Sequence, residues 1–453
     1  MPSSRFLTSR AMMFLGAALT LGACSVPAAL DNAFSGGTSA PAIQTSGVVV
    51  GDEPYAVTAG RTILSQGGSA ADAATAMFFA LSVTYPVSAG LGGGGVCIAS
   101  DNGRLQEFDF LPRAAKANGA YAVPGAVAGF FAMQSAFGIL PWQRDVSPGE
   151  TYAATGFPVS HALSQRLATA QAVIRQDAAL SAEFLDASGA PKAEGSLVRN
   201  VALSQTLATI RLSGADGFYR GAVAAEIAQH AAGAFSAAEL AEYRSTQAAA
   251  HMVAAGGYSI AIPGAQTGSG AFAAALMASV PPSADPEQSI VTAVRAALQK
   301  FGITSLPQDL GATGFAAVDA RGQAVACAVT MNGPLGMGKS VGGTGITLAA
   351  SPGAPAGISS AFLTPLLTRD SSGKIVLAGA GAGGPNGTAA IIYAALKLAG
   401  GRQLGRPSDL RSTGVAPYAT VNAISCDTGA CVPLPDPGGN GLGASADAVI
   451  SER

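Results

Sequence analysis

Three pairs of short β-prone runs, each joined by a tight turn, limit the folds open to this chain more than any other feature. The joining turns end in glycine and cover residues 101–103, 320–322 and 370–373. Runs joined in this way form antiparallel hairpins. Helical patterns precede, separate and follow the hairpins, over residues 69–84, most of 124–276, and 388–398. The first helix is expected to be amphipathic, and the whole order predicts an α+β fold in which helices cover antiparallel sheet.

The composition excludes several broad classes of protein. With 25 Lys and Arg against 27 Asp and Glu, the net charge is -2, so no electrostatic attraction to nucleic acid is expected. Only 11% of residues are charged while 49% are hydrophobic, which excludes disorder caused by charge excess. Beyond the N-terminal segment, no uninterrupted apolar run reaches the roughly 18 residues that a membrane-spanning helix needs. At 453 residues, the chain is long enough to bury a large core.

The first residues resemble the signal of a bacterial lipoprotein. Two arginines precede the apolar stretch 11–21, which has the length of a secretory signal core and is too short to span a membrane. The stretch closes with LGAC, a sequence whose cysteine is lipidated in such proteins. We therefore predict a signal peptide over 1–23, a lipid anchor on Cys24 and a flexible tether over 24–45. This places the protein on the periplasmic side of a bacterial membrane, in contact only through its lipid; an ordinary signal peptide is the alternative.

The sequence predicts different states for two pairs of cysteines. Cys426 and Cys431 lie five residues apart in a glycine- and proline-rich loop, which predicts a disulfide in an oxidising compartment. A metal half-site is the alternative, but the three histidines offer no second half, so we expect no metal. Cys97 and Cys327 lie in apolar strand-like runs and are expected to be buried thiols.

Three glycine-rich motifs suggest known catalytic or nucleotide sites, and each lacks the required context. Residues 379–384 match a dinucleotide-binding pattern, but the strand before them belongs to a hairpin; an oxyanion hole is the alternative. Residues 333–340 match a phosphate-binding loop, and 338–342 match a serine-hydrolase elbow, yet no helix follows. We therefore expect no cofactor, and a proton acceptor other than histidine, such as the freed amine of an N-terminal Thr or Ser.

Five blocks of sequence resemble, in order, the γ-glutamyltranspeptidase family. They are residues 66–74, 81–86, 90–95, 123–130 and 156–160. The resemblance implies an N-terminal-nucleophile hydrolase fold, an αββα sandwich of two mainly antiparallel sheets between helix layers. It also implies a precursor that cuts itself before a threonine, which then serves as nucleophile and base. The implied ligands are a small γ-glutamyl or related amide substrate and a water, amino-acid or peptide acceptor.

The resemblance leaves the nucleophile open between two interpretations. An ungapped comparison places Ala312 at the family's threonine, and alanine has no oxygen with which to attack. If the strand is one residue shorter, helped by a bulge at Gly314, Thr313 is the nucleophile, and this is the interpretation we favour. Cleavage would then give segments 46–312 and 313–453, intertwined in one domain. If the register is ungapped, the chain is an inactive relative that serves as a binding or scaffold lipoprotein.

Other site residues are implied by the same resemblance. Ser359 and Ser360 resemble a serine pair that contacts the glutamyl carboxylate, and Arg113 is displaced by two positions from an arginine that binds a carboxylate. Residues 348–352 carry no charge where the family has an acid for the substrate amine, a loss of roughly 1.5–3 kcal/mol per charge-assisted bond. The residues that resemble the hydroxyl, the amide and the oxyanion-hole glycines of the site are Thr330, Asn332, Gly383 and Gly384.

Overall fold

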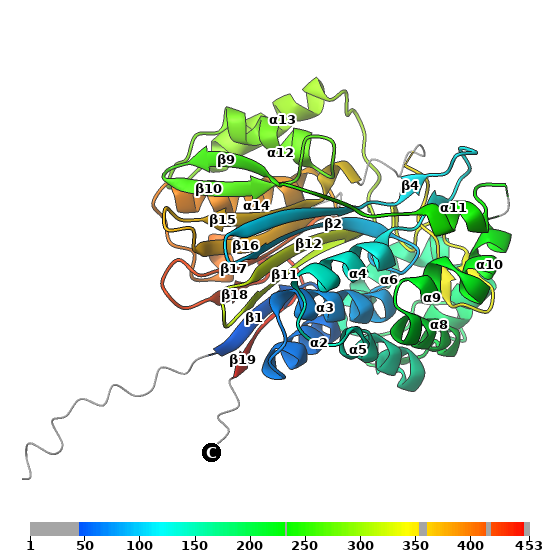
Figure 1. Ribbon diagram of the computed structural model, residues 1–453. Coiled ribbons are helices and arrows are strands. Elements are labelled where there is room, and N and C mark those ends of the chain that lie inside the picture. The colour runs from blue at the N-terminus through cyan, green and yellow to red at the C-terminus, as the bar shows by residue number, and fades with distance from the viewer. Residues whose placement is uncertain (1–44, 232, 353–359, 414–417, 448–453) are drawn as a thin grey trace, which may run out of the picture. The chain divides into compact units, whose positions relative to one another are not determined.

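Two antiparallel sheets lie face to face at the centre of the chain (Figure 1). The computed structural model describes residues 45–231, 233–352, 360–413 and 418–447, so the expected signal peptide, tether and lipidated Cys24 lie outside the described residues. The first sheet has the order β19 (Leu442–Asp447), β1 (Thr45–Gly51), β11 (Ala312–Asp319), β12 (Ala324–Thr330), β2 (Gly94–Asp101), β3 (Arg104–Phe110) and β8 (Thr246–Ala248). The second has the order β18 (Val432–Leu434), β17 (Thr420–Ser425), β16 (Ile375–Ala382), β15 (Thr364–Arg369), β10 (Tyr258–Ile262) and β9 (His251–Ala255).

The three predicted hairpins are confirmed as the pairs β2–β3, β11–β12 and β15–β16. Three further short pairs lie outside the two sheets. They are β4 (Arg113–Ala114) with β5 (Ala122–Val123), β6 (Phe157–Pro158) with β7 (Leu197–Val198), and β13 (Ser340–Val341) with β14 (Ile346–Thr347). Among the described residues, no helix combines the length and apolar character that crossing a bilayer requires.

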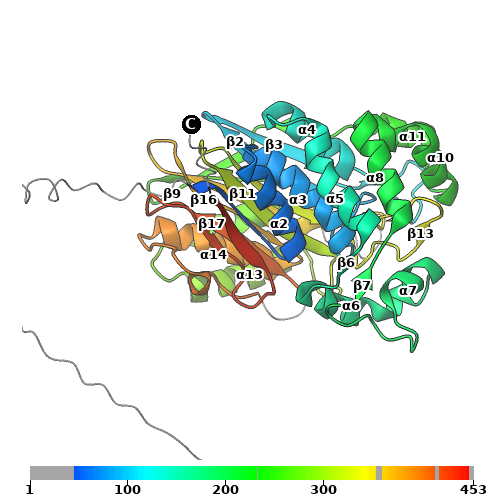
Figure 2. The ribbon, with the colours of Figure 1, turned by 90° about the horizontal axis from the view of Figure 1, so that it is seen from below.

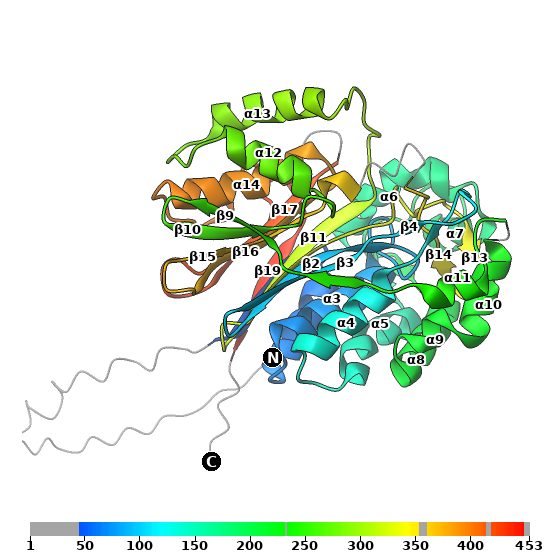
Figure 3. The same ribbon diagram turned by 45° about the horizontal axis from the view of Figure 1, so that its top comes forward.

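Helices cover the outer face of each sheet, which confirms the αββα arrangement. The second sheet is covered by α14 (Pro385–Ala399), on which α12 (Gly270–Ser279) and α13 (Glu287–Lys300) lie (Figure 3). The first sheet is covered by α2 (Pro54–Ser65), α3 (Ala70–Thr84) and α4 (Ala126–Phe137), and α5 (Trp142–Thr155) packs on α3 (Figure 2).

Further helices gather at one end of the sheets (Figures 1 and 2). They are α6 (His161–Ile174), α7 (Ala178–Phe184), α8 (Val201–Ser213), α9 (Asp216–Tyr219), α10 (Gly221–His230) and α11 (Ala237–Glu242). A short 3₁₀ helix, η2 (Pro407–Asp409), follows α14. The helix-rich block expected over 124–276 is therefore confirmed, although it also contains strands.

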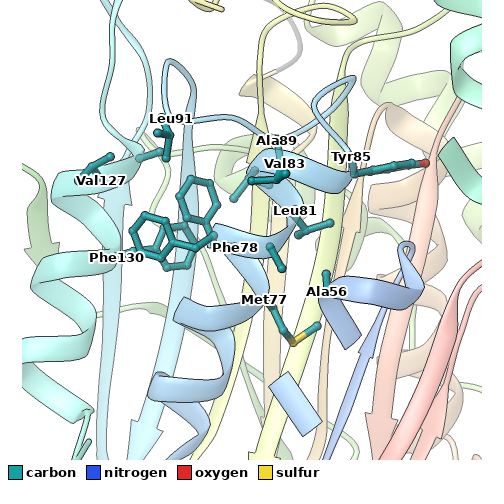
Figure 4. Close-up of a cluster of buried hydrophobic side chains, with 14 of the residues drawn as sticks. Ala56, Met77, Phe78, Leu81, Val83, Tyr85, Ala89, Leu91, Val127 and Phe130 are labelled. Carbon is teal, nitrogen blue, oxygen red and sulfur yellow. The ribbon is translucent and has the colours of Figure 1, made fainter. Parts of the chain in front are cut away.

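The helix α3 begins where the sequence predicts but buries its whole surface. Ser69 caps it, and the side chain of Asp72 accepts a hydrogen bond from the main-chain N–H of Ser69. Every residue of α3 is buried, so the expectation of an amphipathic helix is wrong. The reason is that α3 lies between the first sheet and the helices α2, α4 and α5 and has no face left for water. Figure 4 shows Phe78 of α3 lying against Phe130 of α4, with ring centroids 4.2 Å apart.

The strand β11 runs in unbroken register along β12, and its side chains alternate between two environments. Pairing extends from Ala312 opposite Thr330 to Val318 opposite Ala324 without a shift, so the bulge considered at Gly314 does not form. Ala316 packs between the sheets, whereas Phe315 packs against the helix layer. The register therefore fixes which residues at the start of β11 face the second sheet.

Two disulfides are present in the described chain. Cys426–Cys431 confirms the sequence-based prediction. Cys97 and Cys327 also form a disulfide, so the expectation of two buried thiols is wrong. Because β2 and β12 pair with these two cysteines directly opposite each other, their side chains meet on one face of the sheet. The bond joins the segments on either side of residue 312.

Candidate active site

The start of β11 lies between the two sheets, and its first residue is Ala312. The side chain of Ala312 is 1% exposed and packs with Leu363, Ala380 and Ala382. Across the first sheet it stands opposite Thr330, its partner in the strand pairing. A methyl group therefore occupies the point where this strand pair meets the second sheet.

Thr330 contacts the main chain immediately before Ala312. Its hydroxyl donates to the carbonyl of Gly311 at 3.1 Å and accepts from the main-chain N–H of Asn332 at 2.9 Å. The carbonyl of Gly311 belongs to the peptide bond that leads into Ala312. Thr330 is therefore placed to polarise that bond, but the residue after the bond carries no hydroxyl.

Asn332 and Ser360 complete a hydrogen-bonded group with Thr330. Asn332 lies in the left-handed region with a φ of 53°, and its Nδ2 donates to the carbonyl of Ala350 at 2.9 Å. The hydroxyl of Ser360 donates to Oδ1 of Asn332 at 3.3 Å. The structure thus brings together three residues that the sequence assigned to one site, while Ser359 lies outside the described residues.

Thr313 belongs to a different group of polar side chains. Its hydroxyl, which is buried, donates to Oδ2 of Asp52 at 2.5 Å. The other oxygen, Oδ1 of Asp52, accepts from the hydroxyl of Thr420 and from Nδ2 of Asn422. The amide of Asn422 also donates to the carbonyl of Gly314 at 2.9 Å. The Thr313 hydroxyl therefore hydrogen-bonds to the buried carboxylate of Asp52 and not to Thr330.

Gly383 and Gly384 connect β16 to α14 at the edge of the Ala312 cluster. Their φ values of 83° and 153° lie in a region that side chains rarely adopt, so this turn requires glycine. Gly384 caps the first turn of α14, where the helix macrodipole places partial positive charge. Ala382, which packs with Ala312, directly precedes the pair. Main-chain donors of the kind that an oxyanion hole needs therefore lie beside Ala312.

Arg113 lies at the rim of this region. Its guanidinium carbon is 4.9 Å from the ring centroid of Tyr243, a cation–π contact. The hydroxyl of Tyr243 donates to the carbonyl of Leu111 at 2.8 Å, and Leu111 packs against the Ala312 cluster. Arg113 thus follows Leu111 by two residues, and its side chain is stacked on the ring of Tyr243.

A buried ion pair holds the segment before β11, and no sequence pattern predicted it. Arg166 of α6 binds Asp309 through two hydrogen bonds of 3.0 and 2.8 Å, with side chains 1% and 8% exposed. The guanidinium carbon of Arg166 also lies 3.8 Å from the ring centroid of Tyr418. Oδ1 of Asp309 accepts from the N–H of Gly311 at 2.8 Å. No local signal links residues this far apart in the chain, so the pairing appears only in the folded molecule.

A family model for γ-glutamyltranspeptidase matches residues 56–280, which include α2, α3 and the hairpin β2–β3. Over these residues the chain matches the γ-glutamyltranspeptidase family. It is 32% identical over 232 residues to the glutathione hydrolase proenzyme of Escherichia coli, a match covering 46% of this chain and 40% of that protein. It is 33% identical over 194 residues to glutathione hydrolase 2 of Arabidopsis thaliana, covering 39% and 33%. The matched part is therefore less than half the length of either relative.

Solved structures extend the likeness to the rest of the fold. The γ-glutamyltranspeptidase of Helicobacter pylori is 25% identical with a TM-score of 0.50, covering 55% of this chain and 81% of that one. The cephalosporin acylase of Bacillus halodurans is 18% identical with a TM-score of 0.68, covering 88% and 96%. The second comparison shows a common N-terminal-nucleophile hydrolase fold. Because the family match ends at residue 280, the assignment of residues around Ala312 rests on the strand register.

Proposed function

We propose that this γ-glutamyltranspeptidase relative binds a small γ-glutamyl or related amide ligand between its sheets without cleaving it. The observation that carries the proposal is that Ala312 stands opposite Thr330 and beside the Ala382–Gly384 turn. This is where the family resemblance implies the threonine nucleophile. Alanine has no oxygen, so neither self-cleavage nor acyl transfer is possible through this residue.

The position of Thr313 supports the same proposal. Successive side chains of a strand point to opposite faces, and the unbroken register of β11 directs Ala312, not Thr313, toward the second sheet. Bringing the Thr313 hydroxyl to Thr330 requires a one-residue shift, which would also move Phe315 out of the helix-side core. It would also remove the hydrogen bond from Thr313 to Asp52.

The segment before β11 supports an uncut chain. Leu310 is fully buried in the core beneath the second sheet, and Asp309 is held by Arg166. The carbonyl of Gly311 accepts hydrogen bonds from Thr330 and from the N–H of Met331. A new amino terminus at residue 312 or 313 would have to separate from a segment that is packed and bonded on several sides.

The polar groups near Ala312 indicate which kind of ligand this site could bind. Thr330, Asn332 and Ser360 offer hydroxyl and amide groups, and the Gly383–Gly384 turn offers main-chain donors to an acyl oxygen. Residues 348–352 carry no charge, so a ligand whose amine is neutral or absent fits this face better than glutathione does. We also propose that the chain is anchored by a lipid on Cys24 on the periplasmic side of a bacterial membrane. Mass spectrometry of the mature N-terminus tests this: a Cys24 that carries no acyl chains would exclude the anchor.

The deciding experiment is intact mass spectrometry and reducing gel electrophoresis of the purified wild-type chain. Reduction is needed because the Cys97–Cys327 disulfide would hold two cleaved segments together. We expect one unbroken polypeptide. Ala312→Thr restores a hydroxyl beside Thr330 and is expected to produce cleavage between residues 311 and 312. Ala316→Thr is the matched control, because it adds the same side chain to the same face of β11, away from Thr330, and is expected to stay intact.

A second candidate function is hydrolysis or acyl transfer through Thr313. The observation in its favour is the 2.5 Å hydrogen bond from Thr313 to Asp52, because an adjacent general base can activate a hydroxyl nucleophile. This function predicts that the wild type yields segments 46–312 and 313–453, and that Thr313→Val prevents the cut. Wild-type cleavage at this bond, lost in Thr313→Val, would refute the binding proposal and establish the enzyme.

A further inference from the structure

A cavity of about 240 Å³ opens beside the start of β11. It is larger than the ~150 Å³ cavity that holds benzene in an engineered protein core. It lies close to the candidate site, because Ala419 in its wall would be 3.0 Å from a Cβ atom added to Gly383. Its polar side chains come from α6, from the segment before β11, and from β17 and its flanks: Thr169, Gln308, Asp309, Thr413, Tyr418, Thr420, Asp436 and Asn440.

Nearby positive side chains neutralise only part of the negative charge around the cavity. Asp309 in the wall is neutralised by Arg166. Asp436, also in the wall, and the neighbouring Asp52 have no ion-pair partner within 4 Å in the part of the chain that the structure describes. Burial raises the pKa of Asp436, and the negative charge of Asp52 raises it further. An added cation at this point would offset both effects.

The hydrogen bonds to Asp436, which lines the cavity, come from one hydroxyl and two main-chain N–H groups, and none comes from a positively charged side chain. Oδ2 of Asp436 accepts from the hydroxyl of Thr413 and the N–H of Val421, and Oδ1 accepts from the N–H of Gly438 at 2.8 Å. Oδ1 of Asn422 is buried and accepts no hydrogen bond within the described chain. It would lie 3.3 Å from a Cβ atom added to Gly441, just past the loop that borders the cavity. A ligand that brings several N–H donors and positive charge matches these groups.

We propose that this cavity binds a small molecule through its primary ammonium group, with Asp436 as the counter-charge. An ammonium group supplies three donors and one positive charge. The hydroxyls of Thr169 and Thr420 and the amide of Asn440 line the remaining wall and orient the rest of the molecule. This goes beyond the proposed function, and it does not depend on whether the chain is cut at β11.

The test is isothermal titration of the full chain with two probes that differ only at the amine. Alaninamide has one ammonium group as its only charge, and N-acetylalaninamide is its uncharged counterpart. We expect alaninamide to bind the wild type, and N-acetylalaninamide to bind at least about tenfold more weakly, because it loses a charge-assisted hydrogen bond. Asp436→Asn should weaken alaninamide binding to a similar extent. Asp216→Asn, on the exposed side of α9, should leave it unchanged.

A second variant keeps the proposal testable if Asp436→Asn does not fold. Thr169→Phe fills the cavity from an exposed helix position without touching Asp436, and should reduce alaninamide binding at least about tenfold. Thr209→Phe is its control: Thr209 is also an exposed helical threonine, and its hydroxyl bonds the helix backbone. Equal binding of the two probes, no binding of alaninamide, or full affinity in the folded cavity variants would each overturn the proposal. Cleavage of the wild type would overturn only the proposed function.

Discussion

Ala312 and Thr313 are neighbours in β11, yet they belong to two regions of different chemistry. Ala312 lies in a small apolar cluster between the sheets, beside hydrogen-bonding groups that carry no charge. Thr313 donates to Asp52 in a buried group that includes a carboxylate, a second threonine and an amide. The groups suited to bind an acyl oxygen therefore lie on the side without a nucleophile. The side with the Thr313 hydroxyl lacks those groups. A catalytic site needs both on one side.

The largest expected effect comes from the ion pair that holds the entry to β11. Arg166→Met leaves Asp309 buried without its partner and is expected to lower the free energy of unfolding by about 3–5 kcal/mol. The double variant Arg166→Met/Asp309→Asn should recover part of this loss, because no buried charge then remains. Urea unfolding of the three chains measures both values. If the single variant is as stable as the wild type, the segment before Ala312 is not held by this pair.

The free energy of unfolding is expected to depend on pH through Glu53, which follows Asp52 on the Thr313 side. Burial raises the pKa of Glu53 from 4.5 to about 7, so the folded chain keeps a proton that the unfolded chain releases between these values. The free energy of unfolding should fall as the pH rises through this range, by up to ~3 kcal/mol at 1.36 kcal/mol per unit. Glu53→Gln should remove this fall.

The control for this prediction is Glu226→Gln, an exposed position on α10. Urea unfolding at pH 4.5, 6 and 8 compares the three chains. We expect the difference between wild type and Glu53→Gln to change with pH, and the difference for Glu226→Gln to stay nearly constant. A Glu53→Gln chain with the pH dependence of the wild type would show that folding does not raise the pKa of this carboxyl.

Removing the Thr313 hydroxyl tests the hydrogen bond that this residue makes to Asp52. Thr313→Val leaves Oδ2 of Asp52 without this donor inside the protein, which should lower the free energy of unfolding by about 1–3 kcal/mol. The chain should stay uncut, as the wild type does. Thr313→Ser keeps the donor and should recover most of the loss. Stability equal to the wild type in Thr313→Val would show that Asp52 does not depend on this hydrogen bond.

The smallest effect is expected on the Ala312 side. Thr330→Val removes a neutral hydrogen bond to the carbonyl of Gly311, which still accepts from the N–H of Met331, and it removes the acceptor of the Asn332 N–H. The expected loss in the free energy of unfolding is about 1–2 kcal/mol. In the Ala312→Thr background, however, Thr330→Val should also slow or prevent the gained self-cleavage. A double variant that cleaves as fast as Ala312→Thr would remove Thr330 from the proposed site.

Much of the fold was predictable because its signals are local. The glycine turns gave the three hairpins, and Ser69 with Asp72 marked the start of α3. Even so, the helix was expected to keep a polar face, because the sequence does not show how many elements will pack around it. The predicted grouping of Thr330, Asn332 and Ser360 came from the family resemblance, and the structure places them in hydrogen-bond contact.

The sequence alone therefore predicted the three hairpins, the helical stretches and the family resemblance, but not strands such as β1, β17 and β19. Turn and capping chemistry depends on residues a few positions apart, so it can be read along the chain. Three contacts are seen only in the folded structure: the Cys97–Cys327 bond, the Arg166–Asp309 pair and the hydrogen bond from the Thr313 hydroxyl to Asp52. These contacts join residues far apart in sequence. They depend on the register and layering that form when the sheets and helices pack together.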